Sequence, residues 1–217
     1  KEVLRVSKST GKGAVDIAKA FQIVGSAQPE LLSSAAALGS VTEAAVLLSK
    51  AGNIDVPEAA NSLALAMNQF VASALEAASY TDILATSQQK GTATIPQLSE
   101  SLKNVGSVAR ASGLSFETTN AALQGLAKGG LVGAEAGTKL RTILLRLAKT
   151  GRDDLNPATQ KFSDILGVLK KEVGTVTDAQ KLFGEEAAAA ALTLINQKQV
   201  IEDLDGALNV NGAALEQ

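Results

Sequence analysis

Residues 113–148 read GLSFETTNAALQGLAKGGLVGAEAGTKLRTILLRLA, and this stretch decides the fold. Ser115 is placed to cap a helix, because its side-chain oxygen can accept a hydrogen bond from a backbone N–H of the first turn. Apolar residues then recur at helical spacing up to residues 129–130, a glycine pair that can adopt the left-handed conformation found at helix ends. A second apolar pattern covers residues 134–149. The stretch therefore predicts a helical hairpin.

The same alternation of apolar helical patterns with glycine stops continues through the chain. Helix starts are indicated by Ser40 with Glu43, a capping-box spacing, by Asp55, and by Thr175 or Thr177. Further helices are predicted at 14–24, 29–39, 40–52, 56–75, 80–89, 96–112, 157–167, 176–183, 185–196 and 199–208. No stretch alternates apolar and polar residues long enough to indicate a strand. We expect an all-α fold, a compact multi-helix domain of short helical hairpins with no sheet.

Three segments are expected along the chain. Residues 1–28 form a basic lead-in with the first helix, and the start at Lys1 without a methionine suggests a cut from a longer neighbour. Residues 29–210 form the helical core domain, and residues 211–217 a frayed tail. Aligning Lys50 with Lys128 pairs two similar helix–glycine–helix segments. Duplication and convergence of two hairpins both explain this similarity, and convergence is favoured.

Composition narrows the classes of function. The chain is 46% hydrophobic but only 3% aromatic, so its core must be aliphatic, which suits close helix-on-helix packing. The net charge of −2 provides no overall basic field for nucleic acid, so DNA contact is not indicated, although a local basic face is not excluded. The absence of cysteine and histidine removes disulfides, thiolate and imidazole catalysis and nearly all zinc chemistry. The small-apolar run at 187–195 is shorter than the ~20 residues of a membrane span.

Short motifs follow one another in a fixed order around the central hairpin. They are Ala44-Ala45-x-x-Leu48-x-x-Ala51-Gly52, Gly113-Leu114-Ser115-x-Glu117, Ala122-Leu123-x-x-Leu126-Ala127-x-Gly129-Gly130, Gly133-x-Glu135-Ala136-Gly137-Thr138-x-Leu140-Arg141-Thr142-x-Leu144-x-Arg146-Leu147 and Phe183-Gly184-Glu185-Glu186-Ala187. Over roughly residues 35–195, this order resembles the core domain of phage tail tape measure proteins.

The resemblance implies a structural protein of a phage or prophage tail. It implies a fragment of the tape measure protein that sets tail length and acts in tail assembly and DNA injection, or viral genome ejection. Expected partners are other tape measure copies, tail tube proteins and tail chaperones. Expected locations are the virion tail and, during synthesis, the bacterial host cytoplasm. The alternative is a helical-repeat interaction module of a bacterial secretion or prophage-like system.

The expected shape is not a rod. One continuous helix of this length would extend on the order of 300 Å. The 19 glycines and 4 prolines interrupt the pattern, and the apolar stripe keeps register for no more than about three heptads. We therefore expect a compact domain within a longer tape measure protein.

No catalytic, metal or cofactor site and no small-molecule substrate is predicted, and the protein is not expected to be an enzyme. The acidic pairs at 153–154 and 185–186 could serve glycoside hydrolysis, but both lie where a helix start favours acidic residues. The chain has no tryptophan and one tyrosine, so it lacks a usual sugar-stacking surface. The glycine-rich run 129–133 lacks the G-K-[ST] ending of a phosphate-binding loop.

The candidate interaction residues all lie in the second helix of the central hairpin. Gly133 and Gly137 share a helix face and would allow a neighbouring helix to approach closely, unless Gly133 only forms the first turn and Gly137 is a tolerated defect. Lys139 and Arg146 share a second face, whereas Arg141 points elsewhere. These three cations form either a solvated face, which is favoured, or a contact with the tail tube, another copy or DNA.

Overall fold

The computed structural model describes residues 1–213 of the chain. These residues form α-helices and three short 3-10 turns, and contain no β-strand. The helices are α1 (Glu2–Thr10), α2 (Ala14–Ala27), α3 (Ala35–Gly52), α4 (Val56–Phe70), α5 (Ala77–Lys90), α6 (Ile95–Ala111), α7 (Phe116–Lys128), α8 (Gly133–Lys149), α9 (Phe162–Glu172), α10 (Val176–Phe183), α11 (Glu185–Asn196) and α12 (Lys198–Ala213). The expected all-α fold is confirmed.

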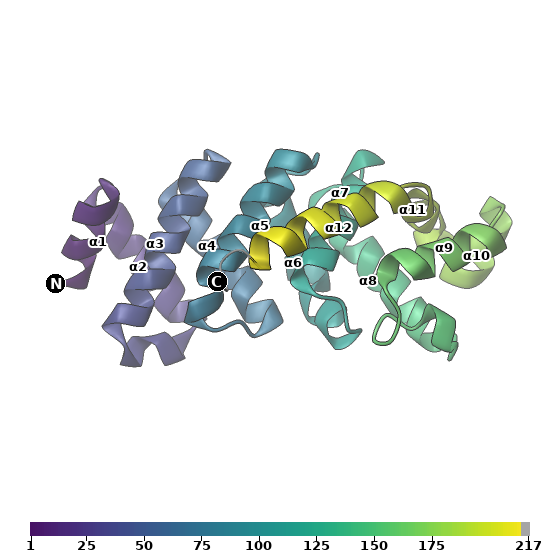
Figure 1. Cartoon of the computed structure of the whole chain (residues 1–217), viewed down its shortest axis with the longest axis horizontal. Helices are drawn as coiled ribbons and strands as arrows, with labels where there is room; N and C mark the ends of the chain where they lie inside the picture. The colour runs from purple at the N-terminus through teal and green to yellow at the C-terminus, as the bar shows by residue number, and fades with distance from the viewer. Residues whose placement is uncertain (214–217) are drawn as a thin grey trace.

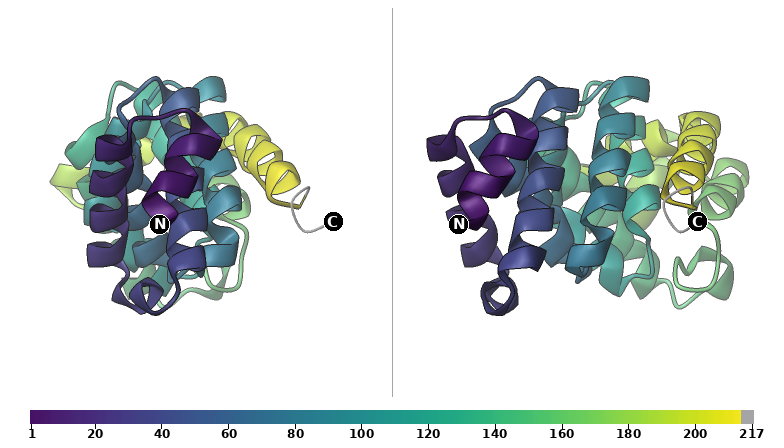
Figure 2. Two further views of the ribbon diagram at one scale, coloured as in Figure 1. Left: turned by 90° about the vertical axis from the view of Figure 1, so that its left-hand side faces the viewer. Right: turned by 60° about the vertical axis from the view of Figure 1, so that its left-hand side comes forward.

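Successive helices alternate between two layers, which gives the row of hairpins seen in Figure 1. Helices α2, α4, α6 and α8 contact one another in that order and form one layer. Helices α1, α3, α5 and α7 do the same in the other layer. Figure 2 shows this arrangement from the end that carries α1. Each hairpin thus buries its apolar faces against its neighbours, as in solenoid proteins.

The order changes beyond α8. Helices α9, α10 and α11 gather at the end of the row opposite α1 (Figure 1). Helix α12 then turns back and packs on α7 and α5, and also touches α9. It therefore joins segments that are distant in sequence.

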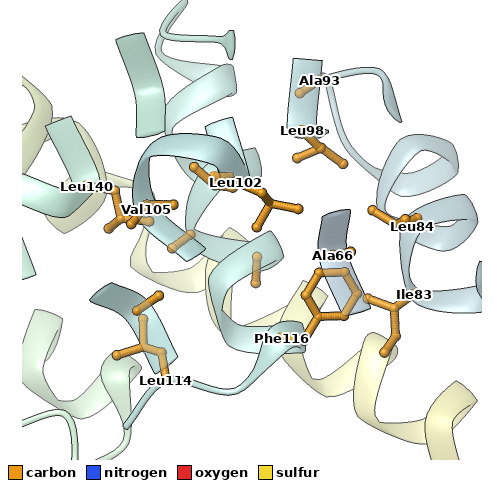
Figure 3. Close-up of a cluster of buried hydrophobic side chains, with 14 of the residues drawn as sticks. Ala66, Ile83, Leu84, Ala93, Leu98, Leu102, Val105, Leu114, Phe116 and Leu140 are labelled. Carbon is orange, nitrogen blue, oxygen red and sulfur yellow. The ribbon is translucent and has the colours of Figure 1, made fainter. Parts of the chain in front are cut away.

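Helix α7 lies at the centre of the molecule. Every residue from 119 to 127 is buried, because α5, α6, α8, α11 and α12 all contact this helix. At its start, the Phe116 ring stacks on Tyr80 with 4.4 Å between centroids, and lies 5.1 Å from the ring of Phe70. Figure 3 shows Phe116 beside Ile83 among aliphatic side chains. Apart from Phe162, Phe183 and Met67, the rest of the buried core is aliphatic, as the composition predicts.

Local capping chemistry sets several helix ends where the sequence predicts them. The Ser115 hydroxyl accepts a hydrogen bond from the Thr118 N–H at 3.1 Å, and the Asp55 carboxylate accepts one from the Glu58 N–H at 2.7 Å. Thr175, rather than Thr177, caps α10 in a capping box with Asp178. Gly130 has φ 88° after the end of α7. The central hairpin is therefore confirmed.

Two predicted boundaries at Gly39 and Ser40 are wrong. Helix α3 passes through both residues, and Ser34 caps it by accepting a hydrogen bond from the Ala37 N–H. Gly39 is buried under α1, where an added Cβ would lie 3.0 Å from the Arg5 guanidinium. Gly39 therefore lies beneath the Glu2 and Arg5 side chains of α1 and does not end the helix. Ser40 donates a hydrogen bond to the Ala36 carbonyl, 3.1 Å away.

Two other predicted helices are also misplaced. The helix expected at 56–75 ends at Phe70, because Val71 adopts the left-handed conformation with φ 60°. The helix expected at 157–167 does not begin at Pro157, which lies in a turn. Helix α9 begins at Phe162 and continues through Gly167 to Glu172.

The first helices share the core of the rest of the chain. Val6 in α1 and Ile17 in α2 are fully buried in the same apolar cluster as residues of α3 and α4. The division of the chain at residue 28 stays a prediction. Helix α12 extends to Ala213, and residues 214–217 of the expected frayed tail lie outside the described residues. None of the helices described is long and apolar enough to cross a membrane.

Candidate interaction surface on helix α8

Helices α6 and α8 approach each other closely at Gly137. An added Cβ on Gly137 would overlap the Ser101 carbonyl oxygen and would lie 2.8 Å from both Cα and carbonyl carbon of Ser101. These are backbone atoms, which cannot move aside as a flexible side chain would. The absence of a side chain at Gly137 therefore sets the separation of the two helices.

Two polar side chains of α6 hold the first turn of α8. The Ser101 hydroxyl donates to the Gly133 carbonyl at 2.7 Å, and the Asn104 amide donates to the Ala134 carbonyl at 3.0 Å. Gly133 itself has φ +62°, and an added Cβ there would meet only Glu100, at 4.0 Å. Gly133 thus provides the conformation of the helix start, whereas Gly137 lies at the contact.

The three candidate cations do not form one patch. Arg141 is exposed, Lys139 is half-buried, and Arg146 is exposed beside the junction of α10 and α11. There, Nη2 of Arg146 would lie 3.1 Å from a Cβ added to Gly184. Within residues 1–213, no ion pair involves any of the three.

The exposed stripe of α8 differs from the predicted set of residues. Arg141, Leu145 and Lys149 follow one another at helical spacing and are all exposed, with Leu145 at 45%. A leucine between two cations offers apolar contact as well as charge. For the three cations, the favoured solvated face and the alternative contact with a partner both stay predictions.

Of the acidic pair at 153–154, Asp154 belongs to an ion-pair network with Arg152 and Glu172. Nη2 of Arg152 lies 2.7 Å from a carboxylate oxygen of Asp154 and also 2.7 Å from one of Glu172. Hydrogen bonds from Arg152 lower the pKa of both carboxyl groups. A general acid requires the opposite shift, towards a higher pKa. The network instead fastens the loop after α8 to the end of α9.

The pair at 185–186 forms the exposed first turn of α11. Acidic residues there interact favourably with the N-terminal end of the helix dipole. Among residues 1–213, no cluster of three or more acidic side chains has an arrangement that could hold a metal ion.

Sequence reasoning missed Gln124, which is buried in α7 with 1% of its surface exposed. Its side-chain oxygen accepts hydrogen bonds from the N–H groups of Thr92 and Ala93, both at 2.7 Å. Its amide nitrogen donates to the carbonyls of Ser87 at 2.8 Å and Ala93 at 2.9 Å. A Cβ at Gly91 would overlap this side chain. Gln124 therefore fixes the turn between α5 and α6. In the sequence, the only sign of this role is a polar residue within a largely apolar helix.

Exposed apolar side chains on two connections were also missed. Leu32, before α3, is 65% exposed, and the α4–α5 connection presents Val71 at 71% and Leu75 at 94%. The Asn68 amide donates to the Ala27 carbonyl at 3.0 Å, so the C-terminal ends of α4 and α2 are adjacent. The connections that follow these ends therefore lie on one edge of the row.

Comparison with known proteins agrees with a tail protein. The family model of the phage-related minor tail proteins matches residues 1–208, nearly the whole chain. No curated protein and no solved structure matches the chain. The family match thus includes both layers of hairpins and most of α12. On this match, the chain belongs to the family of phage-related minor tail proteins.

Proposed function

We propose that this chain is a folded helical segment of a phage tail tape measure protein, which helps set tail length and acts in tail assembly and DNA injection. The family membership supports a structural role in a phage tail. The motif resemblance to tape measure core domains supports the more specific role. The proposed location is the virion tail, after synthesis in the bacterial host cytoplasm.

One observation carries the proposal. The motif at 133–141, the most specific part of the resemblance, forms the contact between α6 and α8. Gly137 lies against the Ser101 backbone, and Arg141 is left on the surface. The motif thus encodes close packing of two helices, which suits a structural scaffold. Proposed partners are other tape measure copies, tail tube proteins and tail chaperones.

Loss of the gene that encodes this chain separates the tape measure role from other minor tail roles. A tape measure role predicts no tails, or tubes of uncontrolled length, when particles are viewed by negative-stain electron microscopy. A minor component of the tail tip would leave tails of normal, uniform length that fail to infect. Uniform tails of normal length would contradict the proposal, and complementation with the intact gene is the control.

Charge reversal then tests the exposed face of α8. Arg141→Glu combined with Arg146→Glu should lower the free energy of unfolding by no more than about 1 kcal/mol, because both side chains are exposed and only Arg146 lies in the last turn of α8, where a cation is favourable. If the cations only face solvent, as we expect, tails form in normal numbers. A stably folded variant that blocks tail formation would instead place these residues at a contact.

A further inference from the structure

We infer that α12 can leave its own chain and dock on the same site of a second copy, so that two chains exchange this helix. The α12 site is the surface of α5 and α7 on which α12 packs. The inference concerns how two copies of this chain associate, and it does not depend on the tape measure role.

The bend between α11 and α12 is not encoded locally. Only Gln197 separates the two helices, and residues 185–205 contain neither glycine nor proline. The last turn of α11 has no basic residue and the first turn of α12 has no acidic residue, so neither end suits its helix dipole. Lys198 begins α12 at the end where a cation is unfavourable. By contrast, Gly184 with φ 78° separates α10 from α11.

Helical hydrogen bonding almost crosses the bend. The Gln197 N–H donates to the Thr193 carbonyl at 2.9 Å, and the Ile201 N–H donates to the Gln197 carbonyl at 3.0 Å. Both bonds have the spacing of an α-helix. The N–H groups of residues 198–200 lie at the start of a helix, so they have no intrahelical acceptor. If the bend straightened, these groups could donate hydrogen bonds to the carbonyls of residues 194–196. The product is one continuous helix of about 40 Å.

Contacts distant in sequence hold α12 in its bent position. The Thr118 hydroxyl donates to the Asp205 carboxylate at 2.8 Å. Ile201 fills the space above Gly125, where an added Cβ would lie 2.6 Å from Cγ1 of Ile201. Leu204 and Leu208 are buried. A second copy presents identical groups, so exchange would keep every one of these contacts while relieving the bend.

The α12 site is also imperfectly filled within one chain. A cavity of about 310 Å³ remains between α12 and the C-terminal ends of α5 and α7. It is lined by Lys90, Gly91, Gln124, Lys128, Val200, Asp203, Leu204 and Ala207. This incomplete filling lowers the cost of removing α12.

Variants of the hinge residue provide the first test. Gln197→Ala favours the continuous helix and Gln197→Gly opposes it. The two variants should differ by about 1 kcal/mol in the free energy of straightening the bend, which is about fivefold in the equilibrium constant for each hinge. An exchanged dimer contains two hinges, so the effect on the dimer fraction is larger still. After refolding at high concentration, light scattering should show more dimer for Gln197→Ala than for the natural chain, and least for Gln197→Gly. A Gln197→Ala chain that stays monomeric would overturn the inference.

Cysteine pairing distinguishes exchange from association through another surface, because the natural chain has no cysteine. Chains carrying Thr118→Cys and chains carrying Asp205→Cys, each on the Gln197→Ala background and of different mass, are refolded together. A short bismaleimide should then link unlike chains, as intact mass spectrometry would show. Like chains alone are the control, and a single chain with both cysteines should close on itself when monomeric. Dimers that form without the mixed cross-link would overturn the inference.

Discussion

Gly137 in α8 lies directly against the backbone of Ser101 in α6, so that a Cβ atom would overlap the Ser101 carbonyl oxygen. This relationship brings two main chains into contact in the middle of the layer formed by α2, α4, α6 and α8. It also gives a structural reason for the glycine in the most specific motif of the chain.

Gly137→Ala should therefore lower the free energy of unfolding by roughly 2 kcal/mol, because the two helices must separate. Gly137→Leu should be more harmful. The matched control is Gly206→Ala in α12, where nothing lies within 4 Å of an added Cβ, so alanine should stabilise by about 0.5–1 kcal/mol. Urea unfolding followed by circular dichroism measures both. Equal effects at the two glycines would contradict the close contact.

Gln124→Leu should destabilise the fold by about 3 kcal/mol, because it leaves buried backbone groups of the α5–α6 turn without partners. Chemical denaturation gives the loss in stability. Hydrogen exchange should show faster exchange at Thr92 and Ala93, whose N–H groups lose their acceptor. Gln180→Leu, at an exposed position of α10, is the control and should change little. Unchanged protection at Thr92 and Ala93 would argue against the role given to Gln124.

Removal of Arg152 should change how stability depends on pH. The pKa values of Asp154 and Glu172 are lower in the folded chain than their ordinary values of 3.8 and 4.5. This stabilisation is fully present above those ordinary values and is lost as the pH falls through the lowered ones. The melting temperature of Arg152→Gln should thus lie below that of the natural chain at pH 7, and the gap should narrow towards pH 2.

Both carboxylates in this network are exposed, so added salt should also narrow the gap at pH 7. Arg141→Gln, which removes an exposed arginine outside any ion pair among residues 1–213, is the matched control. A gap that is independent of pH would mean that Arg152 acts through packing.

Val71→Asn should stabilise the fold by about 1 kcal/mol. Val71 ends α4 with φ 60°, a conformation that strains β-branched residues and that asparagine tolerates. The chain already has an asparagine at the equivalent place after α3, where Asn53 has φ 51°. Leu47→Asn, an exposed position inside α3, should instead destabilise by about 0.5 kcal/mol. Differential scanning calorimetry compares them, and a loss of stability in Val71→Asn would contradict the strain.

The sequence predicts helix ends well where local chemistry determines them. Asp55, Ser115 and Thr175 cap helices as expected, because a cap needs only the backbone of the next turn. Glycines are harder to interpret. Gly130 follows the end of α7, but Gly39 lies inside α3 under the Arg5 and Glu2 side chains of α1. Which role a glycine has depends on what packs against it, and that information is distant in sequence.

The candidate surface shows the same limit. The motif at 133–141 draws attention to α8, and helical spacing separates Arg141 from Lys139. Neither observation identifies Ser101 as the neighbour of Gly137, nor shows that Arg146 lies beside Gly184. Gln124 was missed because its four hydrogen bonds go to a turn some 30 residues earlier. The return of α12 onto α5 and α7 was missed for the same reason.

That return has a mechanical consequence. A simple stack of hairpins can fray from either end, one unit at a time, because each unit touches only its neighbours. Helix α12 (198–213) packs on α5 (77–90), so this contact closes the chain between the two helices into a loop that contains the intervening helices. The helices within this loop should unfold cooperatively, whereas α1 and α2 lie outside it and can unfold separately.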